Sequence, residues 1–247
     1  MSTQKQGELY FSWGYNTEWF TKSTVHVSQP KEGNVYDLVS VNARDHRGWD
    51  QGLFTEPVTI PQYNYRVGYF FANNSGWGIE GNFDHTKYLI VQGQNVHVKG
   101  TLGGIQKDIT VNFTQDNGFY YWLNNGANFL LINAVKRWRP ISNSRGTIKI
   151  DAIAKAGIGP VIPHVQNMLF FEANNPHFQF GGWNVGMEGV IRATFYKYVY
   201  LEYSNKLDFA SYSGLKIKSN GVISQSFGTY EMILSLGANI FTGKKMQ

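Results

Sequence analysis

Three polar residues near the start of the chain have the types that a hydrolase uses. His26 and Ser28 are two positions apart, so in a strand both side chains lie on one face, where an imidazole could deprotonate the hydroxyl. A third group must orient the histidine, and Asp37 is the nearest candidate in the sequence. A match this short is common by chance, and Pro30 must soon end the strand. We therefore expect polar loop residues here, with no catalytic site, and keep catalysis as the alternative.

A second group of polar residues consists of single charges between apolar positions. Glu188 and Arg192, for example, fall on the face opposite Met187 and Ile191. Buried charges must pair, because an unpaired one is costly. We predict a network of ion pairs that fills a closed interior, with a conducting or proton-linked path as the alternative. The charges that the pattern places on this inner face are Glu18, Arg66, Glu80, Asp84, Lys149, Asp151, Glu188, Arg192, Glu202, Lys206 and Glu231.

The other histidines show no spacing that suits a metal ion. The chain has no cysteine, which excludes disulfides and thiolate ligands. Asp84 and His85 are adjacent, so in a strand they point to opposite faces and indicate a structural role. We expect no metal and no cofactor. The histidines that lie far apart in the sequence are His46, His97, His164 and His177.

The segment of residues 178–196 indicates what kind of sheet positions these side chains. Alternate positions form a continuous apolar face: Trp183, Val185, Met187, Gly189, Ile191, Ala193 and Phe195. The opposite face is small and holds isolated charges, with Val190 as its one bulky apolar exception. A soluble sheet would bury its apolar face and show water a charge-rich one. This pattern is typical of a transmembrane β-barrel, apolar toward lipid and polar toward a narrow lumen.

The same two-faced pattern recurs along most of the chain. It is found at residues 9–19, 62–71, 77–84, 147–154, 199–206 and 230–239, and less regular strands are expected near 35–44, 105–114 and 127–138. Further pairing around 88–103 would add to the count. We predict an all-β fold, an antiparallel up-and-down transmembrane β-barrel of about ten strands (eight to twelve), with both termini on one side.

The connections alternate in length, which indicates orientation. Long polar segments at 21–33, 114–126, 157–177 and 213–223 are expected as external loops. Short turns are expected at Tyr196–Tyr198 and Pro140–Arg145 on the other side. Residues 47–59 are too long and Asn73–Gly76 too short for this alternation. We expect a single domain over residues 1–247, with the barrel at 7–242.

The composition agrees with a membrane barrel. Charged residues make up 16% of the chain, against roughly 25% in an average soluble domain, while aromatic residues also reach 16%. No run of apolar residues is long enough for a spanning helix. The formal net charge is +5, but its basic residues form no long stripe, so nucleic-acid binding is not expected. Short basic clusters at Lys136–Arg139 and Lys244–Lys245 suit lipid head groups or solvent.

Three stretches resemble one known protein family. The segment GWGIEGNFDHTKY at Gly76–Tyr88, the opening ELYFSWGYN and the closing LSLGANIF look like the small outer-membrane β-barrel proteins of Gram-negative bacteria, particularly the Bacteroidota type. The resemblance implies an outer-membrane location, contact with membrane lipid and lipopolysaccharide, and insertion by a barrel-assembly machinery. It implies no activity. The chain departs from the family because Thr242–Gln247 follows the final aromatic residue, Phe241.

The N-terminus differs from that of a newly made outer-membrane protein. Residues 1–6 are polar and no apolar stretch follows them, so the sequence begins without a signal peptide. Since an outer-membrane protein needs one, we expect a mature or recombinant form. A cytoplasmic protein is the rival explanation.

Several expected loops are rich in aromatic residues, which has two interpretations. In the first interpretation, these aromatic residues form an interfacial belt at the head-group level. They are Phe119–Trp122, Phe170, Phe171, Trp49 and Phe54. Alternatively, they would bind a glycan or a protein partner.

The function that these patterns favour is not enzymatic. We expect a porin-like membrane protein that supports the envelope, admits small solutes or lipids through a narrow bore, or binds a partner through its loops. One alternative is an outer-membrane lipid hydrolase, since phospholipases and lipid A deacylases of this membrane resemble the chain in using a His-x-Ser pair, here His26 and Ser28. A soluble β-sandwich binding module is the other alternative.

Overall fold

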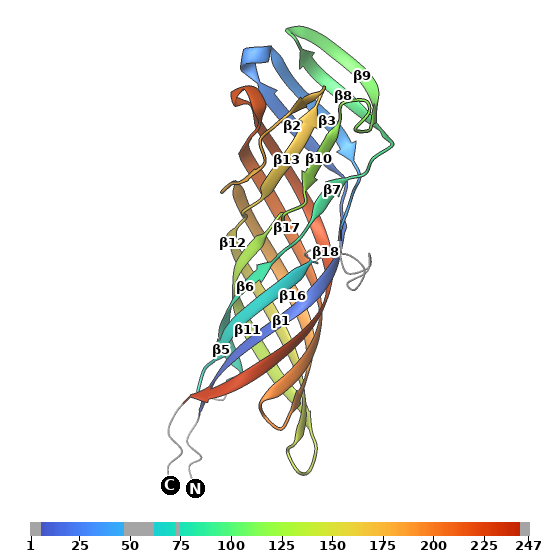
Figure 1. The fold of residues 1–247 in the computed structure, drawn as a ribbon. Helices are drawn as coiled ribbons and strands as arrows, with labels where there is room; N and C mark the ends of the chain where they lie inside the picture. Colours follow the sequence, from blue (N-terminus) through green and yellow to red (C-terminus); the bar gives the residue numbers. More distant parts are fainter. Residues whose placement is uncertain (1–5, 47–61, 73–74, 243–247) are drawn as a thin grey trace.

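Eight antiparallel strands close into a ring in the computed structural model, which describes residues 6–46, 62–72 and 75–242 (Figure 1). In spatial order they are β1 (Gly7–Phe20), β5 (Tyr63–Phe70), β6 (Trp77–Asp84), β11 (Phe129–Ser142), β12 (Ile148–Pro160), β16 (Gly182–Phe195), β17 (Val199–Lys216) and β18 (Val222–Thr242). The ring closes between β1 and β18, which pair from Gly7↔Thr242 to Phe20↔Thr229. β1 starts and β18 finishes at the same end of the ring, as the sequence predicts.

The ring confirms the predicted fold class, and its strand number lies at the lower limit of the expected range. Two of the expected strands, near 35–44 and 105–114, do not enter the ring. They lie beyond the ring instead, in an extension of its sheet that continues from β18. Period-two alternation identifies a strand but does not say which sheet the strand joins.

The outer surface of the ring is apolar along its length. In β1, Leu9, Phe11 and Trp13 are exposed, while Tyr10 and Ser12 between them are buried. The segment 182–195 behaves as predicted, with Asn184, Glu188 and Arg192 buried in the ring. Bulky aromatic residues mark both ends of this apolar band: Trp19, Trp183, Phe209 and Tyr230 at one end, and Phe71, Trp77, Trp138 and Phe195 at the other.

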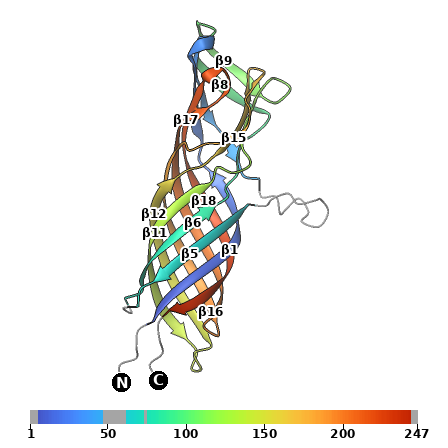
Figure 2. The same ribbon diagram turned by 60° about the vertical axis from the view of Figure 1, so that its left-hand side comes forward.

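A second β-structure, here called the head, continues from the ring at the end opposite the termini (Figures 1 and 2). β2 (Ser23–Gln29) pairs with the upper part of β18, and the sheet then continues through β3 (Asn34–Val41), β8 (Gln94–Leu102) and β9 (Ile105–Phe113). A 3₁₀ turn, η1 (Pro30–Glu32), joins β2 to β3, and η3 (Lys218–Asn220) joins β17 to β18. Pro30 therefore ends β2, as the sequence predicts.

Short strands form the second sheet of the head. It contains, in order, β14 (Glu172–Ala173), β13 (His164–Leu169), β10 (Tyr120–Leu123), β7 (Tyr88–Ile90) and β4 (Ala43–Arg44), and β15 (His177–Phe178) pairs with β13. The two sheets share one apolar core, to which Val25, Leu38 and Val98 contribute from the first sheet and Leu123 and Val165 from the second. The head is thus a packed unit with its own core.

The head corrects the prediction that the long connections are external loops. β2 lies within 21–33, β10 within 114–126, and β13 within 157–177, while β17 and β18 extend into 213–223. Of the two short turns predicted at the other end, Tyr196–Tyr198 is confirmed, because β16 and β17 are joined through Tyr196 and Lys197, which both have positive φ. The turn predicted at Pro140–Arg145 is shifted, because β11 continues to Ser142 and β12 begins at Ile148. The unusual segment 47–59 and Asn73 lie outside the described residues. In the described ranges, no helix has the length and apolar character needed to cross a bilayer.

Candidate functional site

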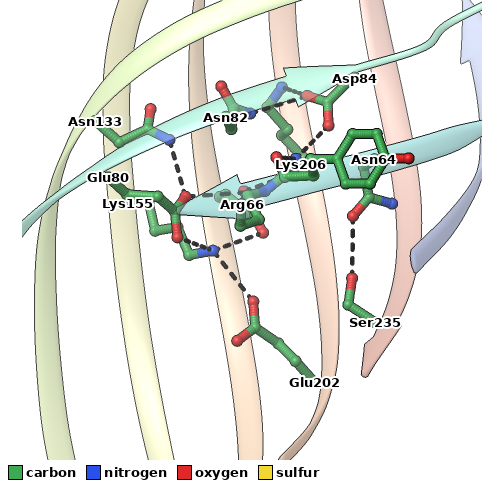
Figure 3. A network of polar contacts seen from close by, with 12 residues as sticks. Asn64, Arg66, Glu80, Asn82, Asp84, Asn133, Lys155, Glu202, Lys206 and Ser235 are labelled. Atoms are coloured by element: carbon green, nitrogen blue, oxygen red, sulfur yellow. Dashed lines mark hydrogen bonds and ion pairs between the residues drawn. The ribbon is translucent and has the colours of Figure 1, made fainter. Parts of the chain in front are cut away.

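The lumen of the ring is filled by ion pairs centred on Lys155 (Figure 3). Lys155 Nζ lies 3.0 Å from Glu80, 3.3 Å from Glu188 and 3.1 Å from Glu202, and all four side chains are buried. These residues come from β6, β12, β16 and β17. A buried cation is tolerated when carboxylates surround it in this way, because each group replaces the water that the others have lost.

Two further cations extend the network toward the head. The Arg66 guanidinium lies 2.5 Å from Asp84 and 3.7 Å from Glu188. Lys206 Nζ lies 2.6 Å from Asp84 and 2.8 Å from Asp208. Asp84 therefore joins the two cations across the lumen, and Glu231, 3.8 Å from Lys206, borders the network on β18.

Aromatic rings lie in the lumen on the terminal side of the charges. The Arg192 guanidinium lies between the rings of Tyr10 and Tyr200, at 4.5 and 4.0 Å from their centroids, and bonds Glu202 at 2.7 Å. Val190 belongs to the same buried layer, which explains why it breaks the polar face of its strand. The full layer contains Tyr10, Phe70, Val135, Ile153, Val190 and Tyr200.

The two tyrosines fit because glycines face them on neighbouring strands. Tyr10 is paired with Gly68 and Tyr200 with Gly237. A Cβ at Gly68 would lie 2.2 Å from the Tyr10 ring, and one at Gly237 would lie 2.2 Å from the Tyr200 ring. The glycines of the inner face thus make room for the tyrosine rings of the neighbouring strands.

The core of the head closes the opposite end. The Phe129 ring lies 5.8 Å from Lys206 Nζ and belongs to the head core. Above it, the Tyr212 hydroxyl donates to the Ala127 carbonyl at 3.0 Å. The aromatic layer, the charge network and the apolar head core therefore follow one another in the lumen toward the head.

The predicted inner-face residues fall into two sets. Eight of them come together in the network just described: Arg66, Glu80, Asp84, Glu188, Arg192, Glu202, Lys206 and Glu231. Asp151 lies nearer the terminal end, where it pairs with Arg139, and Glu18 bonds the Asn16 amide below the head. Lys149 is half-buried and makes no ion pair with any other described residue.

Sequence reasoning missed several members of the network. Lys155 has the same strand parity as Asp151, and Asp208 has the same parity as Lys206, so alternation alone could have found both. The pair between Glu8 and Arg137, 2.6 Å apart at the terminal end, was also missed, although Glu8 has the parity of the buried Tyr10 and Arg137 that of the buried Val135. Arg137 follows Lys136, which contacts Trp77 and Trp138 on the outer surface, so one basic cluster serves both faces of the ring.

The three hydrolase candidates lie on the exposed face of the head. His26 Nδ1 lies 2.7 Å from Asp37 Oδ1, across β2 and β3, with 60% and 43% of the side chains exposed. Ser28 shares this face, but no hydrogen bond joins it to His26 in the described part of the chain. His26 is instead directly opposite Ser224 on β18. The structure brings two of the three groups together, on an open sheet surface.

The remaining histidines have separate structural partners. His97 pairs with Asp108 at 3.0 Å, and His164 packs against Phe178. Asp84 points into the lumen, whereas His85 stacks on Tyr63 and bonds Asn128 at 2.9 Å. Over residues 6–46, 62–72 and 75–242, no group of three His, Asp or Glu side chains could hold a metal ion.

The aromatic segments belong to the interior of the head. Phe119 and Tyr121 are buried in its core, and Phe170 packs against Tyr36 and Phe119. Phe171, in contrast, is 71% exposed. Neither the belt nor the binding interpretation anticipated a packed core at these positions. Trp49 and Phe54 lie outside the described residues.

A buried polar group joins the two sheets of the head. The hydroxyls of Tyr88 and Ser23 lie 2.9 Å apart, and the Gln225 amide donates to both, at 2.6 and 2.8 Å. Burial raises the pKa of the Tyr88 phenol to about 12, although these hydrogen bonds partly oppose the shift. Burial also raises the pKa of Tyr36 and of Tyr121.

Comparison with known proteins gives structural likenesses of low similarity. No protein-family model matches the chain, and no curated protein matches it. Among solved structures, the outer membrane protein OprG from Pseudomonas aeruginosa is 10% identical, with 96% of this chain and 98% of that chain covered and a TM-score of 0.41. The outer membrane protease OmpT from Escherichia coli is 8% identical, with 98% and 99% covered and a TM-score of 0.40. The attachment invasion locus protein Ail of Yersinia pestis is 12% identical, with 95% and 99% covered and a TM-score of 0.33.

Because these TM-scores are low, the fold is assigned from the strand pairing of this chain and not from these likenesses. That pairing gives a closed ring with an apolar outer surface.

Proposed function

We propose that this protein is an integral outer-membrane β-barrel protein of a Gram-negative bacterium, without enzymatic activity, that holds a folded head at the membrane surface to bind a partner. The apolar outer surface of the ring supports the membrane location. Leu234 and Leu236 on β18 and Met187 on β16 are all more than half exposed. Exposure of such apolar side chains is unfavourable in water and favourable in hydrocarbon. A soluble β-sandwich does not fit, since the strands close into a ring.

The filled lumen is the observation that carries the choice among the possible roles. A passage for solutes or lipids needs a continuous bore, but the aromatic layer, the ion pairs and the head core follow one another from end to end. Eight strands leave an interior that side chains just fill. The head, in contrast, is a large folded unit, so binding by the head is favoured over passage.

The partners follow from the location. Membrane lipid and lipopolysaccharide would surround the ring, and a barrel-assembly machinery would insert it. The resemblance of the sequence to Bacteroidota-type barrels supports an origin in that group of bacteria. The residues after Phe241 differ from the family pattern, in which the chain ends on an aromatic residue. Charged residues spread over the head, such as Lys99 and Asp108, suit a glycan or protein partner better than a nucleic acid.

The experiment that tests this proposal is refolding of the protein into phospholipid vesicles. We expect a band whose gel mobility changes on heating, and vesicles that stay impermeable to small ions. A protein that stays monomeric and fully soluble without detergent would contradict the membrane location.

A lipid hydrolase is the second candidate, and the contact between His26 and Asp37 favours it. An aspartate on Nδ1 fixes the tautomer in which Nε2 can act as a base. Fatty-acid release from phospholipid or lipid A by the detergent-solubilised protein, lost in the Ser28→Ala variant, would establish this activity. Ser224→Ala is a necessary second variant, because Ser224 is opposite His26 in the register.

A further inference from the structure

A cavity with both polar and apolar lining lies on the side of the head, where the segment from β14 to β15 passes the upper end of β17. Its volume is about 240 Å³, and its lining residues are Ala173, Asn174, Asn175, His177, Lys216, Ile217 and Lys218. Cavities on the outer surface of the ring are different in character. The one of about 530 Å³ beside Tyr65, Leu130 and Pro160, for example, is almost wholly apolar and faces the region proposed to be lipid.

The two lysines point away from the core because Ile217 points into it. Ile217 is buried in the head core, and in extended backbone its neighbours Lys216 and Lys218 take the opposite side. The backbone that carries them is fixed. The Gln179 amide donates to the Lys216 carbonyl at 3.0 Å and accepts from the Lys216 N–H at 2.6 Å. The Gly221 N–H donates to the Lys218 carbonyl at 3.0 Å.

The opposite wall of the cavity is also fixed. The buried Asn174 side chain accepts from the Asn167 N–H at 2.8 Å and donates to the Val165 carbonyl at 3.0 Å. His177 Nδ1 lies 2.8 Å from the Asn175 carbonyl. A carbonyl can only accept, so Nδ1 carries the proton and Nε2 is the nitrogen left for a ligand. The neutral ring would accept from a ligand hydroxyl there.

The cationic charge of the cavity is only partly balanced. Glu172 Oε1 lies 3.9 Å from Lys218 Nζ, which is too long for a hydrogen bond. Lysine ammonium groups bind sulfate, phosphate and carboxylate oxygens as point charges. Beside them, Ile217 and Ala173 offer apolar contact, and Asn175 and His177 offer polar atoms for hydroxyl groups.

This combination of charge, apolar contact and hydrogen-bonding groups suits an acidic sugar. We propose that the cavity binds an anionic sugar unit, with its sulfate, phosphate or carboxylate on Lys216 and Lys218. Pockets for drug-sized ligands have volumes of about 300–1,000 Å³, so a cavity of about 240 Å³ suits one sugar unit of a longer chain. The inference rests on the proposed function, since it gives the head a class of ligand.

Two sources could supply such a sugar. Lys216 is seven residues beyond Phe209, the exposed aromatic residue at the upper end of the apolar band on β17. That separation is up to about 23 Å along the strand. The cavity therefore lies above the apolar band, at a height that sugars of the surrounding lipopolysaccharide or a free polysaccharide could reach.

The test measures binding of a sulfated disaccharide to the full-length protein in phosphatidylcholine nanodiscs by calorimetry. A neutral disaccharide of the same linkage is the ligand control. The double variant Lys216→Gln/Lys218→Gln should weaken binding by about tenfold or more, because it removes two charge-assisted contacts. Lys99→Gln/Lys107→Gln is the matched control. It removes the same charge from exposed positions on β8 and β9 and should change the affinity less than about twofold.

A second arm adds lipopolysaccharide to the nanodiscs and so distinguishes the two sources. Weaker binding of the sulfated disaccharide there would mean that the surrounding glycolipid occupies the site, and unchanged binding would favour a free polysaccharide. The inference is overturned if the sulfated disaccharide does not bind in phosphatidylcholine nanodiscs, or if both double variants weaken its binding equally. Neither of these results would contradict the proposed membrane barrel, because membrane insertion and ion permeability test the barrel in separate experiments.

Discussion

Lys155 contacts three carboxylates inside the ring, so it is the cation whose removal should disturb the lumen most. Lys155→Met keeps much of the side-chain volume but leaves Glu80, Glu188 and Glu202 without their shared partner. We expect the free energy of unfolding to fall by about 3–5 kcal/mol, as when one partner of a buried ion pair is removed. Urea unfolding in phospholipid vesicles, followed by tryptophan fluorescence, measures it.

Lys149→Met is the matched control for this prediction. Lys149 lies on the same strand, is half-buried and makes no ion pair with a described residue, so its replacement should change stability by less than about 0.5 kcal/mol. Equal effects at the two lysines would contradict the arrangement of the network.

Tyr88 gives the head a dependence on alkaline pH. The folded-state pKa of its phenol is about 12, above the value near 10 expected in the unfolded chain. The neutral form is therefore favoured by folding, and its stabilisation is complete below pH 10 and is lost as the pH rises toward 12. Absorbance at 295 nm should show that Tyr36, Tyr88 and Tyr121 ionise late or together with unfolding. Ionisation of every tyrosine by about pH 10.5, with the head still folded, would disprove this.

At the scale of single residues, the sequence predicts which side of a strand a charge occupies but not its partner. Period-two alternation placed Arg66 and Asp84 inside correctly. It could not show that Asp84 also contacts Lys206, because that contact spans 122 residues and depends on the ring closing. His26 and Asp37 were linked only by being near in sequence, and the hairpin of β2 and β3 places them in contact.

At the scale of the strand, β18 offers a direct test of which surface meets lipid. Leu234 is 55% exposed on the apolar band, so Leu234→Arg should cost about 2–4 kcal/mol if that surface faces the middle of a bilayer. The yield of heat-modifiable protein after refolding into vesicles should fall accordingly. Ser226→Arg is the control, because Ser226 is exposed on the same face of β18 but beyond the band, beside Ser211.

If both arginine variants refold equally well, the apolar band does not face lipid. An inner-face position such as Ser235 would be a poor control, since Ser235 is buried against Gly14 and an arginine there would be excluded for lack of space.

The contact between Gly237 and Tyr200 tests the packing between neighbouring strands. A Cβ on Gly237 would lie 2.2 Å from the Tyr200 ring, so Gly237→Ala should destabilise the barrel by about 1–3 kcal/mol through overpacking. In contrast, a Cβ on Gly189 meets nothing within 4 Å, and Gly189→Ala should be neutral or stabilising by up to about 1 kcal/mol. Urea unfolding of the two variants gives the comparison, and equal stability would contradict the tyrosine layer.

The elements were predicted well where their pattern is regular and poorly where it is not. The alternating strands of the ring, such as β1 and β16, have the predicted faces. Residues 88–123 form β7 to β10 in the head, and their short, partly apolar runs do not distinguish a loop at the membrane surface from a strand in a folded unit. The core of the head brings distant segments together, since Val25 and Val165 belong to one buried apolar cluster.

In the whole molecule, the closed ring carries a folded head at the end opposite the termini, and the proposed role of the ring is to anchor that head in the membrane. Among the described residues, the aromatic layer around Tyr10 and Tyr200 lies below the charges and Phe129 lies above them, and this order of side chains supports the proposal of a lumen without a continuous path. Composition indicated a membrane barrel, but only the positions of these side chains suggest a filled lumen.

Ion permeability of reconstituted vesicles is the direct test of a filled, non-conducting lumen. The protein is refolded into vesicles loaded with a potassium-sensitive dye, and its insertion is confirmed on the same sample by heat-modifiable mobility. The account predicts that inserted protein leaves the vesicles as impermeable to potassium as protein-free vesicles, with no steady conductance steps in a planar bilayer. A steady, ohmic conductance from the inserted protein would contradict it, and would make Arg66, Lys155 and Lys206 the lining of a channel.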